Sequence, residues 1–190
     1  MNAIDQVALY RLLARALTYP EGGFSGTLQE AASRLGLELF NDQALPIAAF
    51  MQAVSELGRL PLDQLQGEHT RLFINGFPRV SCPPYESAYR EGELAGRSAE
   101  TVDGAYRQWG LVAEAEEVDH AGAELEFLAF LMSLDAPEAV AAADDFLASH
   151  ALVWLPRFAE DVARESSLGF YQATGRLLAA LLRPGSDAAG

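Results

Sequence analysis

The sequence has very little of what disulfides, thiolate metal sites and membrane spans require. Cys82 is the only cysteine among 190 residues, so the chain cannot form an internal disulfide or a zinc site of several thiolates. A lone thiol is typical of a reducing compartment. No apolar run reaches the length of a transmembrane helix, and the first residues lack the basic and then apolar regions of a secretory signal. We therefore expect a soluble, cytoplasmic protein.

Basic residues are also scarce. The chain has 13 Lys and Arg against 27 Asp and Glu, which gives a formal net charge of −14. Such a surface repels nucleic-acid phosphates and anionic lipid headgroups and attracts cations. We expect no nucleic-acid partner and no stable membrane insertion. A cationic partner is favoured, although an acidic surface can also serve solubility alone.

The motifs of nucleophilic catalysis and nucleotide binding are missing. The sequence contains no G-x-S-x-G, no G-x-x-x-x-G-K-[ST] and no G-x-G-x-x-G. Cys82 lies beside two prolines, and we interpret it as a packed thiol, not as a nucleophile. We therefore expect no enzymatic activity and no cofactor.

One short motif could suggest a metal. Glu117 and His120 have the E-x-x-H spacing of di-iron helical bundles, which need a second copy of the motif and two further carboxylates. The second copy is missing, because Gln66 precedes His69 and Leu147 precedes His150 at that spacing. No metal site is expected, and a helical-bundle metalloenzyme is the least favoured alternative.

Asp119 also fits a purely structural role. Asp is a preferred N-cap, so Asp119 could cap a helix that His120 opens. A histidine at a helix N-terminus tends to stay neutral, because the helix dipole disfavours its cationic form. In that role Asp119→Asn would keep a workable cap and cost little stability.

The pattern that recurs along the chain is helical. Half of the residues are apolar, and they follow spacings of three and four residues, as in Leu9, Leu12, Leu13, Ala16 and Leu17. We predict an all-α, single-domain bundle of about eight to ten helices over residues 1–190, with no sheet and a frayed tail at about 184–190. The expected helices end near residue 17 and cover about 27–35, 47–57, 61–73, 102–109, 119–134, 138–150, 153–164 and 167–182.

The pattern also predicts the position of one helix and of one proline. The stretch 119–134 is apolar on most sides, which predicts a central, buried helix. Pro156 is expected in the first turn of its helix, since a proline deeper inside would break it.

The helical pattern fails between about residues 74 and 98. This stretch holds three prolines and three glycines, and we predict a long loop between two helical halves. A loop of this length in a compact domain is often functional, although a plain linker is the simpler alternative. Because a flexible connection permits exchange of halves, both a monomer and a domain-swapped dimer are compatible with the sequence.

Three short motifs follow one another in the middle of the chain. Residues 68–73 read EHTRLF, residues 84–89 read PYESAY, and residues 117–120 (EVDH) are followed by ELEF at 124–127. In this order and spacing the chain resembles the TorD/DmsD family of redox-enzyme maturation chaperones. The matching family patterns are E-[YH]-x-x-L-F, P-[YW]-E-S-x-[YW] and E-x-x-D-H, the last of which is matched by Asp119 and His120. Val118 stands where relatives often have Pro, and Tyr85 where they often have Trp, which is compatible with a different client.

The resemblance implies a binding function. Such chaperones bind the twin-arginine signal peptide and the apo form of a molybdenum-cofactor-containing oxidoreductase subunit. They assist cofactor insertion and prevent premature export, and they catalyse no reaction themselves. An adaptor that binds a different protein partner is the main alternative.

A signal peptide of this kind joins two arginines to an apolar run. It therefore needs carboxylates beside an apolar groove. Leu72, Phe73 and Tyr85 could supply apolar walls, while Glu86, Glu117 and Asp119 could meet the arginines. The predicted signal-peptide-binding residues are Leu72, Phe73, Pro84, Tyr85, Glu86, Ser87, Glu117, Asp119 and His120.

Overall fold

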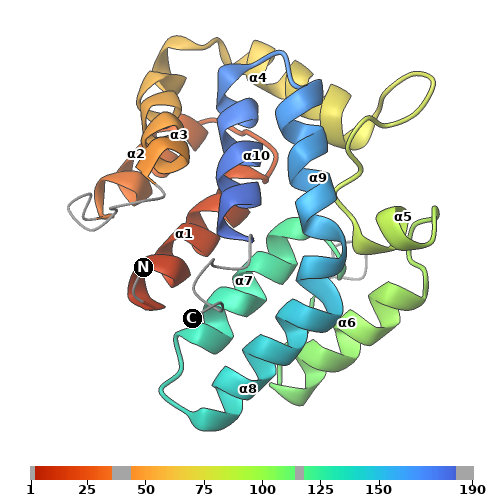
Figure 1. Ribbon diagram of the computed structural model, residues 1–190. Helices are drawn as coiled ribbons and strands as arrows, with labels where there is room; N and C mark the ends of the chain where they lie inside the picture. The colour runs from red at the N-terminus through yellow and green to blue at the C-terminus, as the bar shows by residue number, and fades with distance from the viewer. Residues whose placement is uncertain (1–2, 36–43, 114–117, 183–190) are drawn as a thin grey trace, which may run out of the picture.

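The computed structural model describes residues 3–35, 44–113 and 118–182, and these residues form a helical bundle (Figure 1). Within them the only β feature is an isolated antiparallel bridge between Tyr85 and His120. The predicted all-α fold is therefore confirmed. The helices are α1 (Ala3–Ala16), α2 (Phe24–Ser33), α3 (Ala44–Glu56), α4 (Leu62–His69), α5 (Glu86–Arg90), α6 (Arg97–Gln108), α7 (Ala121–Met132), α8 (Pro137–Phe146), α9 (Leu152–Glu165) and α10 (Gly169–Leu181).

The bundle is built around two helix pairs that share one core. Helix α7 packs against α1, and α10 packs between α9 and α3. As its sequence predicts, α7 is central: Leu125, Leu128 and Leu131 are fully buried. This pairing brings the end of α1 beside the start of α7, although about a hundred residues separate them in sequence. In the part of the chain that the structure describes, no helix combines the length and apolar character needed to cross a membrane.

The expectation for Pro156 was wrong. Helices α8 and α9 are joined without a break by a π turn (Leu147–Ala151), and Pro156 lies inside α9. A π turn shifts the hydrogen-bond register of the helix by one residue. Pro156 has no N–H to donate to the Leu152 carbonyl, and the helix nevertheless continues to Glu165.

The long loop is more ordered than its composition suggests. It contains α5, and its last residues already belong to α6. Its first part returns to the core: the Cys82 amide donates to the Leu72 carbonyl at 2.8 Å, and the Cys82 side chain is fully buried. Burial raises the pKa of the Cys82 thiol to about 12, which agrees with a packed, unreactive cysteine. The segment therefore consists of two short connections on either side of a helical turn.

Candidate functional site

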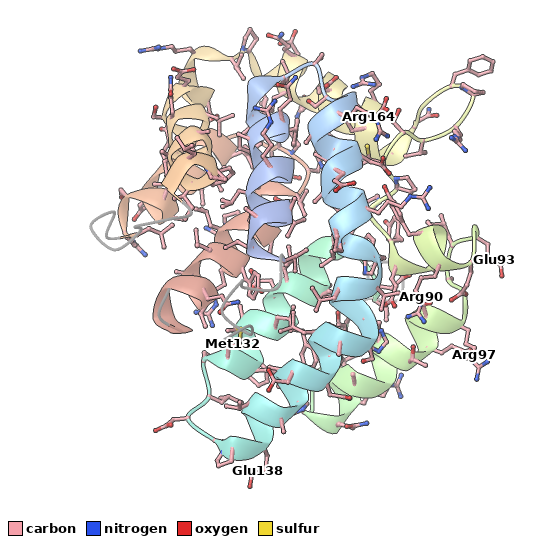
Figure 2. The ribbon with its side chains drawn as sticks, viewed as in Figure 1. Arg90, Glu93, Arg97, Met132, Glu138 and Arg164 are labelled. Atoms are coloured by element: carbon pink, nitrogen blue, oxygen red, sulfur yellow. The ribbon has the colours of Figure 1, made fainter. Side chains whose placement is uncertain are left out.

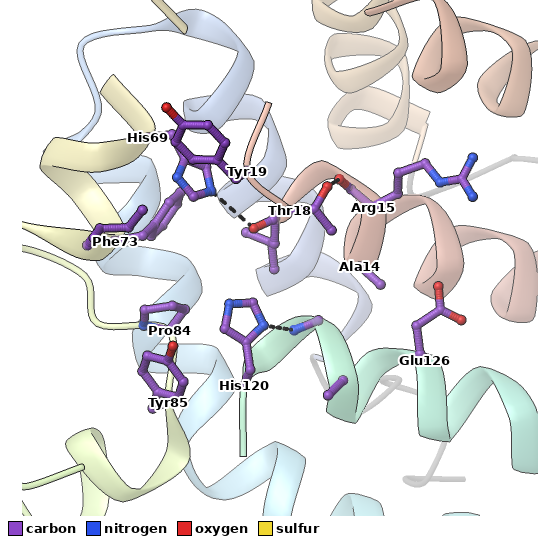
Figure 3. A pocket seen from close by; sticks show the side chains of 14 residues that line it. Ala14, Arg15, Thr18, Tyr19, His69, Phe73, Pro84, Tyr85, His120 and Glu126 are labelled. Atoms are coloured by element: carbon purple, nitrogen blue, oxygen red, sulfur yellow. Dashed lines mark hydrogen bonds between the residues drawn. The ribbon is translucent and has the colours of Figure 1, made fainter. Parts of the chain in front are cut away.

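A pocket of about 510 Å³ opens where four segments meet (Figure 3). These segments are the end of α1, the π turn that follows α4 (Thr70–Ile74), the stretch just before α5 and the start of α7. The three segments predicted to form the client site therefore do converge. The lining residues are Ala14, Arg15, Leu17, Thr18, Tyr19, His69, Phe73, Ile74, Pro84, Tyr85, His120, Gly122, Ala123 and Glu126.

Backbone hydrogen bonds hold the stretch before α5 against α7. The Ala121 amide donates to the Pro84 carbonyl at 2.8 Å, and the Glu86 amide donates to the Asp119 carbonyl at 3.0 Å. Between these bonds lies the bridge of Tyr85 with His120. Pro84 and Tyr85 thus form one side of the pocket, which we call the Pro84/Tyr85 wall.

The cap of α7 differs from the predicted one. Its N-cap is His120, whose Nδ1 accepts a hydrogen bond from the Gly122 amide at 3.0 Å. Asp119 instead accepts from the Ser87 amide at 2.8 Å and so caps α5 from outside that helix. The interpretation of Asp119 as the α7 cap was wrong, because the first turn of α5 competes for the carboxylate. A Cβ on Gly122 would lie 3.2 Å from His120 Nδ1 and 3.4 Å from the Ala14 carbonyl, so α1 and the cap both approach this glycine closely.

His120 is neutral in this arrangement. Burial lowers its pKa to about 4, and repulsion by His69 acts in the same direction and outweighs the opposing effect of Asp119. Since Nδ1 accepts a hydrogen bond, the ring proton is on Nε2, which points into the pocket. The Tyr85 ring packs edge-on against the imidazole at 5.3 Å between ring centroids. The pocket therefore contains a positioned N–H donor.

We expect the stability of the protein to depend on pH through His120. Its folded-state pKa lies below the ordinary value of 6.5, so its contribution is fully present above pH 6.5 and is lost as the pH falls towards about 4. His120→Asn keeps a cap and cannot titrate. Urea unfolding at a series of pH values should show this loss in the wild type and a smaller one in His120→Asn. Identical pH profiles would contradict the assignment.

The opposite side of the pocket is aromatic. The His69 ring is buried and packs against Tyr19 and Phe73 at centroid distances of 5.3 and 4.8 Å, while its Nε2 lies 3.3 Å from the Leu17 carbonyl. Burial lowers the pKa of His69 and keeps it neutral. His69 belongs to the EHTRLF motif but is not among the residues predicted to form the site. The sequence prediction missed the contribution of α1 entirely, because no local pattern links α1 to the motifs.

Two of the predicted acidic residues do not face the pocket. Glu86 is fully buried and Asp119 is 4% exposed, so neither carboxylate can meet an arginine of a bound peptide directly in this structure. Glu117 lies outside the described residues. The acidic group that does line the pocket is Glu126, on the exposed side of α7. Partial burial raises the pKa of Glu126, while Arg11 and Arg15 lower it.

The remaining predicted residues divide between the pocket and the core. Phe73, Pro84, Tyr85 and His120 line the pocket, whereas Leu72 and Ser87 are fully buried behind it. Among the described residues, no group of three or more His, Cys, Asp or Glu side chains is placed to hold a metal ion. A role of these residues in signal-peptide binding stays a prediction.

Comparisons with known proteins identify the family. The sequence model of the nitrate reductase delta subunit family matches residues 37–160, which is more than half of the chain. The chain belongs to this family. The resemblance to redox-enzyme maturation chaperones of the TorD/DmsD type is thereby confirmed.

Individual relatives agree with this assignment. The chaperone protein TorD of Vibrio cholerae serotype O1 (strain ATCC 39315 / El Tor Inaba N16961) is 32% identical over 132 residues, which cover 63% of this chain and 60% of the relative. TorD of Vibrio vulnificus (strain CMCP6) is 28% identical over 195 residues, covering 94% and 90%. A crystal structure from Archaeoglobus fulgidus, described as a redox enzyme maturation protein, superposes with a TM-score of 0.69 at 27% identity and covers 91% of each chain.

Proposed function

We propose that this chain is a cytoplasmic chaperone that binds the twin-arginine signal peptide of a molybdoenzyme catalytic subunit. It holds the apo form of that subunit during cofactor insertion, prevents premature export and catalyses no reaction. The observation that carries the proposal is the pocket, because the three sequence motifs meet there. The names of the relatives, TorD chaperones and a redox enzyme maturation protein, support it.

The chemistry of the pocket suits a cationic and apolar peptide. Phe73, Ile74 and Pro84 offer apolar surface, and the Glu126 carboxylate can accept from an arginine. The His120 Nε2–H can donate to a peptide carbonyl. The net charge of −14 attracts a basic peptide from solution, so raising the salt concentration should weaken binding without abolishing it.

Ile74→Ala should weaken peptide binding without destabilising the fold. The Ile74 side chain lines the pocket and is 56% exposed, so the unbound protein loses little packing when it is shortened. Peptide binding would cover it, and the lost apolar contact should cost about 1 kcal/mol, or about fivefold in affinity. The measurement is calorimetric titration with a peptide of two adjacent arginines followed by an apolar run, beside a thermal melt.

The matched control is Val140→Ala. Val140 is 55% exposed on α8 and does not line the pocket, so shortening its side chain should leave peptide affinity unchanged. A second peptide, in which glutamines replace both arginines, separates charge recognition from apolar binding. Equal affinity of the wild type for the two peptides would contradict twin-arginine recognition.

A further inference from the structure

A cluster of buried polar side chains lies directly behind the Pro84/Tyr85 wall. At its centre are the carboxyl groups of Glu86 on α5 and Glu124 on α7, both fully buried. Every element packed around them contributes a polar group. These groups are Arg90 of α5, Tyr106 of α6, Asp119 before α7, His150 of the π turn between α8 and α9, and Trp154 of α9.

Glu86 is the member of the pair with a guanidinium partner. Arg90 donates to its Oε1, and His150 Nδ1 lies 2.9 Å from Oε2. Arg90 projects from α5 (Figure 2). It also donates to the Ser149 carbonyl at 3.3 Å and so ties α5 to the π turn. A buried carboxylate with a guanidinium partner can keep its negative charge.

Glu124 has no such partner. Among the described residues, no arginine or lysine contacts it, and its neutral donor is Trp154 Nε1 at 3.0 Å. The Glu86 carboxyl is its other hydrogen-bonding neighbour, since Trp154, the donor to Glu124, follows four residues after His150, the partner of Glu86, on the same continuous helix. Two carboxylates cannot hydrogen-bond to each other unless one of them carries a proton.

Burial raises the pKa of Glu124 well above its ordinary value, and the charge of Glu86 raises it further, against the smaller opposing effect of Trp154. The proton is therefore on Glu124, which donates it to Glu86.

The shared proton acts on the pocket through one peptide bond. Glu86 follows Tyr85 directly, so the backbone that presents Tyr85 to the pocket carries the Glu86 carboxyl into the cluster. If Glu124 lost its proton, two adjacent buried carboxylates would repel each other. The easiest relief is movement of the short helix α5, which would loosen the bonds of the Glu86 and Ser87 amides to Asp119.

We propose that Glu124 is a positioning residue for the pocket, and that the proton it shares with Glu86 holds the Pro84/Tyr85 wall in place. Loss of that proton at higher pH loosens the wall. The loosening of the wall does not depend on any ligand. The expected loss of peptide affinity, in contrast, rests on the proposed function.

The pH dependence has a definite sign. The folded-state pKa of Glu124 lies above the ordinary value of 4.5, so the folded protein binds a proton that the unfolded chain releases. The contribution to stability is fully present below pH 4.5 and declines as the pH rises towards the folded-state pKa. Glu124→Gln keeps a neutral group of similar shape that can donate to Glu86 and cannot ionise.

Amide hydrogen exchange tests the proposal without any ligand. We compare the exchange rates of the Glu86, Ser87 and Ala121 amides in the wild type and in Glu124→Gln at each pH, because their ratio cancels the chemical pH dependence of exchange. The ratio should rise by up to about tenfold for each pH unit between the ordinary pKa of 4.5 and the raised pKa of Glu124, and should level off above the raised pKa. Glu100→Gln removes an exposed carboxylate of α6 and should behave as the wild type. A ratio that stays flat with pH overturns the proposal.

Peptide titration provides the functional readout. Affinity for the twin-arginine peptide should fall at high pH in the wild type and in Glu100→Gln but not in Glu124→Gln. The same decline in all three proteins overturns the role of Glu124. If none of them binds the peptide at any pH, the proposed function is wrong, while the exchange ratio still decides on the shared proton.

If Glu124→Gln does not fold, the wild type alone decides the question. The indole N–H of Trp154 donates to Glu124 and should report its ionisation as a pH-dependent NMR shift. Trp109→Phe assigns the signal, since the chain has two tryptophans. A Trp154 resonance that does not respond to pH while the Glu86 and Ser87 amides become exposed would overturn the proposal.

Discussion

Glu68→Ala should destabilise the protein by about 3 kcal/mol, because Glu68 connects α4 to the turn between α9 and α10. The side chain is 7% exposed. It accepts two hydrogen bonds from Arg71 at 2.8 and 2.9 Å, one from the Ser166 hydroxyl at 2.9 Å and one from the Ser167 amide at 2.5 Å. Alanine would remove all four bonds, although Arg71 keeps the Glu165 carbonyl at 2.7 Å and the Ser166 hydroxyl keeps the Leu168 carbonyl at 3.1 Å. Since the Arg71 side chain is 43% exposed, water can replace part of the hydrogen bonding that Arg71 loses.

The same residue should make the protein acid-sensitive. Burial raises the pKa of Glu68, but the hydrogen bonds from Arg71, Ser167 and Ser166 outweigh it and lower the pKa to about 2. Because the folded-state pKa is below the ordinary value of 4.5, this contribution is present above pH 4.5 and is lost as the pH falls towards 2. Glu68→Gln should remove the part of the pH dependence that comes from Glu68, together with part of the stability.

Chemical denaturation gives the free energy of unfolding for each variant. Ser166→Ala removes one of the four bonds of Glu68, together with the bonds of the Ser166 hydroxyl to the Leu168 backbone, and should cost about 1 kcal/mol. A cost for Glu68→Ala no larger than that of Ser166→Ala would contradict the connecting role of Glu68.

Gly175→Ala should destabilise the protein by about 2–3 kcal/mol, although alanine is normally the better helix former. Gly175 is buried on α10 where that helix packs most closely against α9. A Cβ there would lie 2.5 Å from the Ala159 carbonyl and 2.7 Å from the Ala163 amide. Both are backbone atoms, so they cannot rotate away as a side chain would. The two helices would have to separate, and both carry core residues.

Gly104→Ala is the matched control. Gly104 lies in α6, and a Cβ there would meet nothing within 4 Å. Its replacement should stabilise the protein by about 0.5–1 kcal/mol. Thermal melts of both variants compare the steric cost of a Cβ at position 175 with the gain in helix propensity at position 104. Similar shifts of the melting temperature in the two variants would show that the α9–α10 contact is less tight than described.

Most of the helices could be predicted from the sequence, because they have their own apolar faces and local stop signals; Gly22 and Gly23 follow the first helix and Gly110 follows α6. Helix α5 lies in the stretch that was predicted to be a loop, so it was missed. The course of α8 and α9 could not be predicted, since the π turn before Pro156 depends on tertiary packing. The proline by itself indicates only a boundary.

The candidate site could be predicted as a meeting of segments but not as a set of side-chain directions. The motifs indicate that residues around 73, 85 and 120 belong together, and the structure brings them to one pocket. They do not indicate that Tyr85 faces the pocket while Glu86 faces the core. Nor do they show that Ser87 competes successfully for the Asp119 carboxylate. Such choices depend on contacts between segments far apart in sequence.

Photo-crosslinking with a labelled signal peptide tests the central claim most directly. The peptide carries a photoreactive residue next to its two arginines and is bound to the wild-type chain at saturating concentration. We predict that the crosslinks fall on the pocket segments, at residues 14–19, 73–74, 84–85 and 120–126. They should also diminish when unlabelled peptide competes. Crosslinks that concentrate on the face between α3 and α10, around Arg59 and Arg176, would contradict the account.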